Sequence, residues 1–277
     1  MKQSEINAKT VLYCVLGDPV SHSLSPLMHN TAFDHIGTNA VYLAFGMKDK
    51  DLAAAIAGIR ALGIRGASVT IPHKINVMNH LDEVDETALK IGALNTIVNK
   101  NGQLYGYNSD CLGAMSALRE KTPIKGKKVV MAGAGGAARA IGFGIIAEGG
   151  NLTILNQIKE EGEKLAGDLG VGYYPLSDYR NHSCDIFINT TPLGMTPDTE
   201  SMAVTADYLN KDMVVMDIVY NPLKTRLLKE AEALGCTIVD GLSMFVYQGV
   251  SQFESWTGEK APVELMRQVV YKALSGV

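Results

Sequence analysis

Several patterns that would assign this chain to a particular class of protein are scarce or absent from its 277 residues. Its four cysteines are scattered without a C-x-x-C pair, and its six histidines show no metal-ligand spacing, which argues against a zinc or redox site. No stretch reaches the ~20 apolar residues that a membrane-spanning helix needs, and the N-terminal segment lacks the apolar core of a signal peptide. The net charge of -4 includes no long run of one sign, which argues against a nucleic-acid or anionic-membrane surface. We therefore expect a soluble, cytoplasmic protein without a bound metal.

The composition and patterning that are present predict an α/β fold. Hydrophobic residues make up 47% of the chain and charged residues 19%, so the chain can bury the core of one large domain or of two. Strand and helix patterns alternate along most of the length, which is typical of parallel sheets. The first part predicts strands over 11–16, 41–45 and 67–71, helices over 26–35, 51–62 and 112–120, and a hairpin over 95–107. That hairpin turns at Asn101-Gly102, the favoured pair for a type I′ turn.

The segment K-T-P-I-K-G-K-K, residues 121–128, is polar, contains proline and glycine, and indicates a domain boundary. After it, the pattern predicts a strand over 128–132, a helix over 137–148 and a strand over 151–156, the opening of a doubly wound sheet. Further strands over 184–189, 213–217 and 237–239 extend that sheet. We expect an N-terminal α/β domain over 1–120 and a Rossmann-type dinucleotide-binding domain over 121–242. Two last helices, over 243–256 and 262–273, are candidates to pack back on the first domain.

The turn G-A-G-G-A-A-R-A, residues 133–140, lies between a predicted strand and a predicted helix. It fits the pattern G-x-G-x-x-A, in which the first glycine allows a tight turn and the second lets a phosphate approach the backbone. The helix N-terminus adds free N–H groups and a partial positive charge. The alternative is a glycine-rich turn without a ligand. The strand before and the β-α-β spacing favour a dinucleotide, bound by Gly133, Ala134, Gly135, Gly136 and Ala137.

The end of the second strand of such a unit selects the cofactor. An acidic residue there binds the ribose of NAD, and an arginine meets the 2′-phosphate of NADP. Here the strand ends in Asn156-Gln157-Ile158-Lys159, which offers neither. Lys159 is a candidate phosphate ligand, or a solvated helix lysine. The choice between NADP and NAD stays open at this point.

A second candidate site begins at S-V-T-I-P-H-K, residues 68–74, where an apolar strand ends in a lysine. Lys74, if partly enclosed, is a candidate proton donor, whereas the alternative is an ordinary surface lysine. Polar residues in S-H-S-L-S-P, A-L-N-T-I and G-Y-N-S-D are further candidates. Each has a structural alternative: Ser25 as the N-cap of the helix over 26–35, Asn95 and Asn108 as turn formers, and Asp110 as a helix cap.

Seven motifs carry a resemblance to a known family over nearly the whole chain. They are, in order, G-D-P-V-S-H-S-L-S-P-L-M-H-N, S-V-T-I-P-H-K, G-A-L-N-T, G-Y-N-S-D, G-A-G-G-A-A-R-A, N-T-T-P-L-G-M and G-L-S-M-F-V-Y-Q-G. The chain resembles the shikimate dehydrogenases. The resemblance implies NADP-dependent reduction of 3-dehydroshikimate to shikimate, in the pathway to aromatic amino acids, with substrate binding by the N-terminal domain. It leaves open a monomer or a homodimer.

The resemblance also implies roles for individual residues. Lys74 and Asp110 would form the catalytic pair, with Lys74 supplying charge stabilisation and the proton. The substrate would be bound by Ser23, Ser25, Thr70, Asn95, Tyr220 and Gln248. The cofactor would contact the glycine turn, Asn156, Lys159, Thr190, Gly241 and Met244.

Three features depart from the family pattern: two single positions and one segment. Ser68 stands where the family usually has asparagine, and Ser109 where it has threonine, which could weaken shikimate binding or admit quinate. The family segment N-R-T-x-x-R, which grips the 2′-phosphate, is N-Q-I-K-E-E here. Both arginines are missing and two glutamates are present, so NAD is an alternative cofactor.

Three other functions remain as alternatives. A quinate/shikimate dehydrogenase that uses NAD would explain the three departures. A dinucleotide-binding sensor without activity would not need Lys74 and Asp110. A folate-type dehydrogenase shares the general architecture and a lysine, but S-H-S-L-S-P and G-Y-N-S-D suit a small hydroxy acid better.

Overall fold

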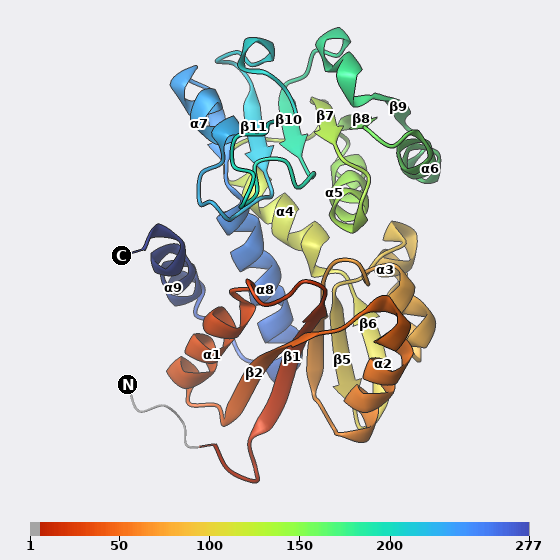
Figure 1. The fold of residues 1–277 in the computed structure, drawn as a ribbon, viewed down its shortest axis with the longest axis vertical. Coiled ribbons are helices and arrows are strands. Elements are labelled where there is room, and N and C mark those ends of the chain that lie inside the picture. The colour runs from red at the N-terminus through yellow and green to blue at the C-terminus, as the bar shows by residue number, and fades with distance from the viewer. Residues whose placement is uncertain (1–5, 277) are drawn as a thin grey trace. The chain divides into compact units, whose positions relative to one another are not determined.

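The computed structural model describes residues 6–276, which form two compact units (Figure 1). The first unit contains residues 6–109 together with Gln248–Ala273. The second contains Asp110–Tyr247 and the residues that follow Ala273. The division therefore passes through helices at all three of its crossings, after Ser109, Tyr247 and Ala273. The limits 1–120 and 121–242 remain a prediction about which segments fold independently.

The first unit is built on a mixed sheet with the strand order β2-β1-β3-β5-β6-β4. β1 is parallel to β2 and to β3, β3 is antiparallel to β5, and β5 forms a hairpin with β6. The hairpin turns at Asn101 and Gly102, whose φ angles of 55° and 92° confirm the predicted type I′ turn. The strands are β1 (Val11–Gly17), β2 (Ala40–Gly46), β3 (Gly66–Val69), β4 (Glu83–Val84), β5 (Thr96–Lys100) and β6 (Gln103–Tyr107).

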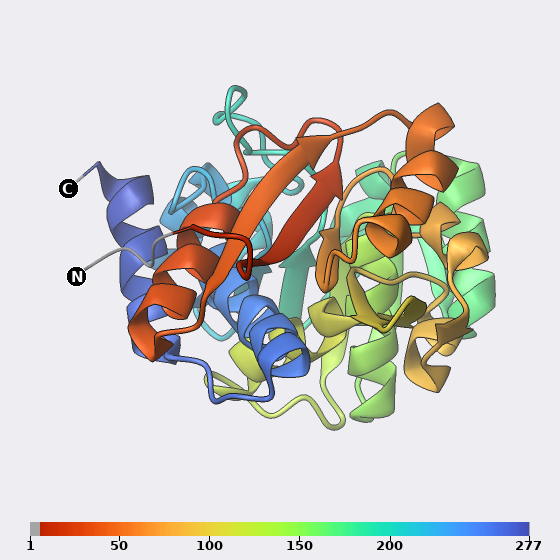
Figure 2. The ribbon, with the colours of Figure 1, turned by 90° about the horizontal axis from the view of Figure 1, so that it is seen from below.

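The two faces of this sheet are covered by different helices, because side chains alternate along each strand. Cys14 and Leu16 of β1 face one core, which includes Ile56 and Ile59 of α2 (Leu52–Ala61). Tyr13 faces the other side, where α1 (Ser25–Ile36) packs with α8 (Gly241–Thr257), as Figures 1 and 2 show. The remaining helices assigned to this unit are α3 (Glu86–Ile91) and α9 (Val263–Ser275), which lies in it up to Ala273.

The second unit is a fully parallel sheet with the order β12-β11-β10-β7-β8-β9. This is the order of a doubly wound dinucleotide-binding fold, and it reverses direction between β7 and β10. Ligands of such folds bind at the carboxyl ends of the strands beside that reversal. The strands are β7 (Lys128–Ala132), β8 (Asn151–Asn156), β9 (Gly172–Pro175), β10 (Ile186–Asn189), β11 (Val214–Asp217) and β12 (Thr237–Val239).

Helices α5 (Gly136–Ala147) and α6 (Lys159–Leu169) follow β7 and β8, and α7 (Arg226–Ala233) follows β11. One core of the unit joins Val130, Phe187 and Val215 of the sheet to Leu227 and Leu228 of α7. α4 (Ser109–Arg119) packs with α5, since a Cβ at Gly144 would lie 2.8 Å from the side chain of Met115. The predicted alternation of strands and helices is therefore confirmed in this unit.

Four elements were not predicted from the sequence: β4, α3, β9 and α7. β4 and α3 are two and six residues long, too short for a periodic hydrophobic pattern to emerge. β9 is a four-residue edge strand that ends in proline.

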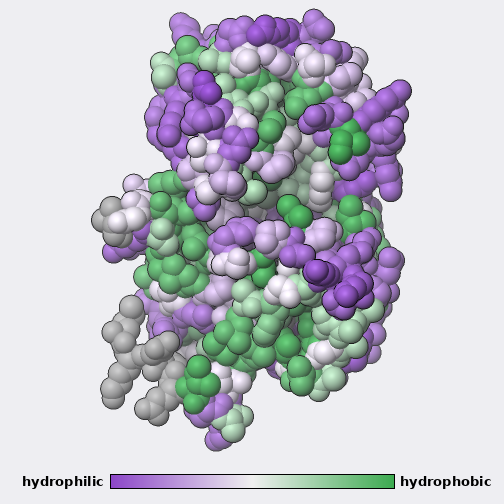
Figure 3. Space-filling view, viewed as in Figure 1, coloured by the Kyte–Doolittle hydropathy of each residue, from purple (hydrophilic) through white to green (hydrophobic). Residues whose placement is uncertain are grey.

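β2 is also an edge strand, at one side of the first sheet. Its side chains Leu43 and Phe45 are 42% and 40% exposed, and Figure 3 shows hydrophobic surface around this strand.

Candidate active site

The carboxyl ends of β1 and β3 hold the first group of predicted site residues. Thr70 directly follows β3, and its N–H donates to the carbonyl of Leu16 near the end of β1 (2.9 Å). The loop that leaves β1 carries Ser23, whose hydroxyl accepts from the N–H of Ser25 (3.3 Å). The predicted N-cap role of Ser25 is wrong, because the N-cap is Leu24 and Ser25 is the first residue of α1. The Ser25 side chain makes no cap hydrogen bond, so capping does not explain a serine at this position.

Lys74 lies on the loop after β3, which is fastened at two points. His73 is fully buried, and its Nε2 lies 2.9 Å from the carbonyl oxygen of Met47, at the end of β2. The carbonyl of Lys74 itself accepts a hydrogen bond from the N–H of Leu94 (2.8 Å). This contact brings the lysine backbone next to the segment that carries Asn95. His73 was not predicted as important, although it directly precedes the lysine.

Asn95 is the centre of a buried group of polar side chains. Its Oδ1 accepts from the N–H and the hydroxyl of Ser109 (2.8 and 3.1 Å) and from the hydroxyl of Thr96 (2.9 Å). Its Nδ2 donates to Oε1 of Gln248 on α8 (3.4 Å). Asn95 and Gln248, which are 153 residues apart in the chain, are thus brought together within one unit. The turn-former alternative does not account for these contacts.

A second group of buried, hydrogen-bonded polar side chains lies beside Asn95, and the sequence analysis did not predict it. Gln252 donates from Nε2 to the carbonyl of Asn95 and to the hydroxyl of Thr96, both at 3.1 Å. Its Oε1 accepts from the hydroxyl of Ser68 (2.8 Å), which in turn accepts from the hydroxyl of Tyr42 (2.6 Å). Burial raises the pKa of the Tyr42 phenol, so it stays protonated and able to donate. The only sequence signal was that Gln252 follows Gln248 by one helical turn.

Asp110 follows Ser109 in the first turn of α4 and is 5% exposed. It belongs to the second unit and Lys74 to the first, so their catalytic pairing stays a prediction. Within the first unit, the structure brings Asn95, Ser109 and Gln248 into direct contact and fastens the Lys74 loop beside them. The backbone of Lys74 thus lies next to a group of buried hydroxyls and amides.

The glycine turn in the second unit has the geometry expected of a phosphate site. Gly133 has a φ of 113°, and a Cβ there would lie 2.3 Å from the hydroxyl oxygen of Thr190, so a larger residue is excluded. A Cβ at Gly135, by contrast, would meet no atom within 4 Å, which leaves open space beside the backbone. Gly135 is the N-cap of α5 and no side chain caps that helix, so its first N–H groups are available to an anion.

The end of β8 carries little positive charge. Asn156 is buried, and its Nδ2 donates to the carbonyl of Ile158 (2.8 Å), which shapes the turn into α6. Lys159 is exposed, and its Nζ lies 3.8 Å from Oε1 of Glu163. Glu160 and Glu161 occupy the first turn of the same helix. The predicted contacts of Asn156 and Lys159 with the cofactor stay predictions.

The remaining predicted residues of the second unit follow β10, β11 and β12: Thr190 and, on α8, Gly241 and Met244 for the cofactor, and Tyr220 for the substrate. Thr190 donates from its hydroxyl to the carbonyl of Ala132, the residue before the glycine turn (2.6 Å). The Tyr220 ring stacks on Phe245 with 4.6 Å between ring centroids, and burial raises the Tyr220 pKa to about 12. Gly241 begins α8 and Met244, 6% exposed, lies one turn later.

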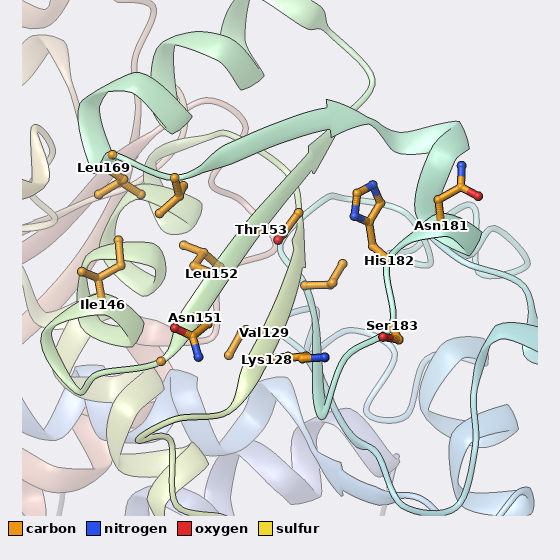
Figure 4. A pocket seen from close by; sticks show the side chains of 14 residues that line it. Lys128, Val129, Ile146, Asn151, Leu152, Thr153, Leu169, Asn181, His182 and Ser183 are labelled. Atoms are coloured by element: carbon orange, nitrogen blue, oxygen red, sulfur yellow. The ribbon is translucent and has the colours of Figure 1, made fainter.

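A cavity of about 530 Å³ lies elsewhere in the second unit (Figure 4). Its lining includes Lys128 and Asn151, the first residues of β7 and β8, together with His182 and Ser183. It therefore lies at the amino ends of these strands, whereas the glycine turn follows their carboxyl ends. The cavity is not the predicted cofactor site.

Two further observations bear on the class of the protein. Among residues 6–276, no group of three or more His, Cys, Asp or Glu side chains is arranged to hold a metal ion. Within the same range, none of the helices is both long enough and apolar enough to cross a membrane.

Comparison with known proteins identifies the family. Residues 15–97 match the model of the shikimate dehydrogenase substrate binding domain, and residues 241–271 match that of the shikimate 5′-dehydrogenase C-terminal domain. The shikimate dehydrogenase (NADP(+)) of Moorella thermoacetica is 46% identical over 282 residues, which cover 98% of this chain and 96% of that protein. This chain belongs to the shikimate dehydrogenase family. The resemblance seen in the seven motifs is confirmed.

Solved structures of shikimate dehydrogenases agree with the fold. A crystal structure of one in complex with NADP+ has a TM-score of 0.94 and 43% identity, covering 99% of both chains. A shikimate 5-dehydrogenase from Listeria monocytogenes, in complex with shikimate and NAD, has a TM-score of 0.88 and 37% identity over 96% of this chain and 98% of that one. The predicted α/β fold, with an N-terminal substrate domain and a C-terminal Rossmann-like domain, is confirmed.

Proposed function

We propose that this chain catalyses the reversible, NADP-dependent reduction of 3-dehydroshikimate to shikimate in the cytoplasm. The observation that supports it most directly is the buried group around Asn95, fastened beside the Lys74 loop at the carboxyl ends of β1 and β3. Shikimate is a small carboxylic acid with several hydroxyls. Amides and hydroxyls held in fixed positions suit the hydroxyls, and Ser23 and Ser25 suit the carboxylate.

The chemistry assigned to this chain's residues is proton transfer and charge stabilisation. NADPH, when bound, supplies the hydride that reaches the ketone carbon of the substrate. The ketone oxygen then gains negative charge, which the Lys74 ammonium stabilises before it donates a proton. Asp110 orients Lys74 and the same oxygen. Thr70, Asn95 and Gln248 hold the ring hydroxyls, and Tyr220 borders the substrate.

The second unit fits a dinucleotide at its pyrophosphate. The open space beside Gly135 and the uncapped start of α5 suit two phosphates that approach the backbone. We assign NADP because the Moorella relative and a solved neighbour are named for it or bind it. NAD remains a second candidate, since Gln157 and Glu161 stand where the family has arginines and the Listeria enzyme was solved with NAD.

The first test replaces the proposed proton donor. We expect Lys74→Ala to lower kcat by about 10²- to 10⁴-fold, the usual contribution of a positioned acid or base, while NADP still binds. Lys90→Ala is a matched control, because Lys90 lies in the same unit but forms an exposed i,i+4 pair with Glu86. Steady-state kinetics and cofactor fluorescence give the two readouts. Near-normal turnover of Lys74→Ala would sink the proposed role.

The second test decides substrate and cofactor together. The values of kcat/KM for shikimate and quinate, each with NADP and with NAD, are measured on the wild-type chain. The proposal predicts the highest value for shikimate with NADP. A higher value for quinate with NAD would favour the quinate/shikimate dehydrogenase, and cofactor binding without activity on either substrate would favour a sensor. Light scattering on the same preparation distinguishes a homodimer from a monomer, the two states that the resemblance leaves open.

A further inference from the structure

A carboxylate is buried at the carboxyl edge of the parallel sheet of the second unit, and none of the roles above uses it. Asp217, the last residue of β11, is 0% exposed. Its Oδ1 accepts from Nδ2 of Asn189 (3.0 Å) and from the N–H of Val219 (3.1 Å). Its Oδ2 accepts from the hydroxyl of Thr225 (2.7 Å). Three donors from three segments therefore converge on one side chain.

Stability alone is a weak reason for this arrangement. Removing a charge from water is costly, and burial raises the Asp217 pKa to about 6 despite the three hydrogen bonds. Well-packed apolar residues in place of buried charges are often neutral or stabilising. A buried carboxylate at the edge where a ligand binds therefore suggests that it holds a particular local geometry.

The first segment that Asp217 holds is the loop after β10. Asn189, at the end of β10, uses its Oδ1 to accept from the N–H and the hydroxyl of Thr191 (3.1 and 2.6 Å). Its Nδ2 also donates to the carbonyl of Leu193 (3.3 Å). Thr190, between these residues, packs directly against Gly133. The loop is thus fixed between Asp217 on one side and the glycine turn on the other.

The second segment is the loop after β11, where Asp217 binds the N–H of Val219. A Cβ at Gly241 would lie 2.5 Å from the carbonyl oxygen of Val219 and 2.6 Å from that of Ile218. The start of α8 therefore packs against this loop at backbone distance. Tyr220 is the next residue along the loop. The third segment is held through Thr225, the N-cap of α7, which also accepts from the N–H of Leu228 (3.4 Å).

We propose that Asp217 is a positioning residue for the cofactor. Its carboxylate fixes the loops after β10 and β11 relative to the glycine turn, and the nicotinamide half of the dinucleotide binds against these loops. The place agrees with the rule that ligands of doubly wound sheets bind beside the strand-order reversal, here between β7 and β10. The inference rests on the proposed function, since it requires that the second unit binds a dinucleotide.

The test compares two substitutions at this position with a distant control. Asp217→Ala removes all three acceptor contacts, and we expect Kd and KM for NADP to rise tenfold or more, with KM for shikimate changed less than twofold. Asp217→Asn keeps an acceptor for Asn189 and Val219, and we expect its cofactor Kd to rise by only about threefold over the wild-type value. Tyr208→Phe is the control. It removes partly buried hydrogen bonds to the carbonyl of His182 (2.5 Å) and to Cys184 (3.3 Å), before the amino end of β10, and should leave the cofactor Kd unchanged.

Each outcome decides the matter. Cofactor weakening in Asp217→Ala, partial rescue in Asp217→Asn and none in Tyr208→Phe support positioning. If Asp217→Ala does not fold, a cofactor Kd of Asp217→Asn raised about threefold, with the shikimate KM unchanged, supports it in the same way. A lower melting temperature with the wild-type cofactor Kd in every soluble Asp217 variant overturns the inference. A wild-type chain that binds neither NADP nor NAD would instead overturn the proposed function.

Discussion

At the scale of single residues, Ser68 departs from the family pattern and makes buried hydrogen bonds within the protein. The family usually places asparagine there, and a missing contact to substrate was one expectation. In the structure the Ser68 hydroxyl connects Tyr42 to Gln252, and Gln252 donates to the carbonyl of Asn95. Ser68 is therefore linked to the candidate substrate group through buried protein contacts.

This link predicts a measurable effect of Ser68→Ala. The Tyr42 hydroxyl and the Gln252 amide oxygen would lose their partner while buried, which costs about 1–3 kcal/mol in the free energy of unfolding. We also expect KM for shikimate to rise severalfold, because Asn95 is less well held, with KM for the cofactor unchanged. Urea unfolding and steady-state kinetics measure the two effects. A change in stability with identical shikimate kinetics would restrict Ser68 to a structural role.

At the scale of elements, we expect the turn from β8 into α6 to decide which dinucleotide is preferred. The two glutamates in the first turn of α6 interact favourably with the helix dipole, but an acid repels a 2′-phosphate. The helix is thus stabilised by residues that disfavour NADP. The cationic residue nearest in sequence to the end of β8 is the exposed Lys159. Its Nζ lies 3.8 Å from Oε1 of Glu163.

Restoring the family arginines tests this conflict. The double variant Gln157→Arg/Glu161→Arg should raise the ratio of kcat/KM for NADP to that for NAD by tenfold or more. Its melting temperature should fall slightly, because a favourable dipole interaction worth about 0.3–1 kcal/mol is lost. Glu163→Arg makes the charge change of Glu161→Arg alone, about 200° around the same helix, and serves as control. An unchanged ratio in the double variant would mean that this turn does not select the cofactor.

At the scale of the whole molecule, two buried groups have opposite effects on acid stability. His29 is fully buried against the rings of Tyr42 and Trp256, and burial lowers its pKa to about 3. Stability from His29 is therefore complete above pH 6.5 and is lost as the pH falls, since only the unfolded chain binds the proton. Asp217, with its pKa raised to about 6, gains stability as the pH falls over much of the same range.

Between pH 7 and pH 5 we expect His29 to remove about 2 kcal/mol and Asp217 to restore about 1 kcal/mol. The free energy of unfolding of the wild-type chain should therefore change little between these two pH values. A variant is needed to separate the two contributions. In His29→Gln the loss disappears, so the variant should gain about 2 kcal/mol relative to wild type when the pH falls from 7 to 5. Urea unfolding at both pH values measures this difference. Parallel pH curves for the two chains would contradict the buried, neutral state of His29.

Much of the architecture was predictable from local sequence. The type I′ hairpin depends on Asn101 and Gly102, and the glycine turn depends on residues adjacent in the chain, so neighbouring residues carry the signal. Short elements without a hydrophobic period, such as β4 and α3, gave no such signal. The cap assigned to Ser25 failed because Leu24 takes the N-cap position and Ser25 already begins α1.

The sequence by itself determined the α/β class, the order of most strands and helices and the glycine turn typical of dinucleotide binding, because these follow from periodicity and turn chemistry over short distances. Only the tertiary structure decided which polar side chains meet. Asn95 meets Gln248 and Gln252 because α8 returns to the first sheet, and Asp217 meets Asn189 because β10 and β11 are neighbours. Such pairings depend on strand order and helix packing over more than a hundred residues or across a crossover, and no local pattern encodes them.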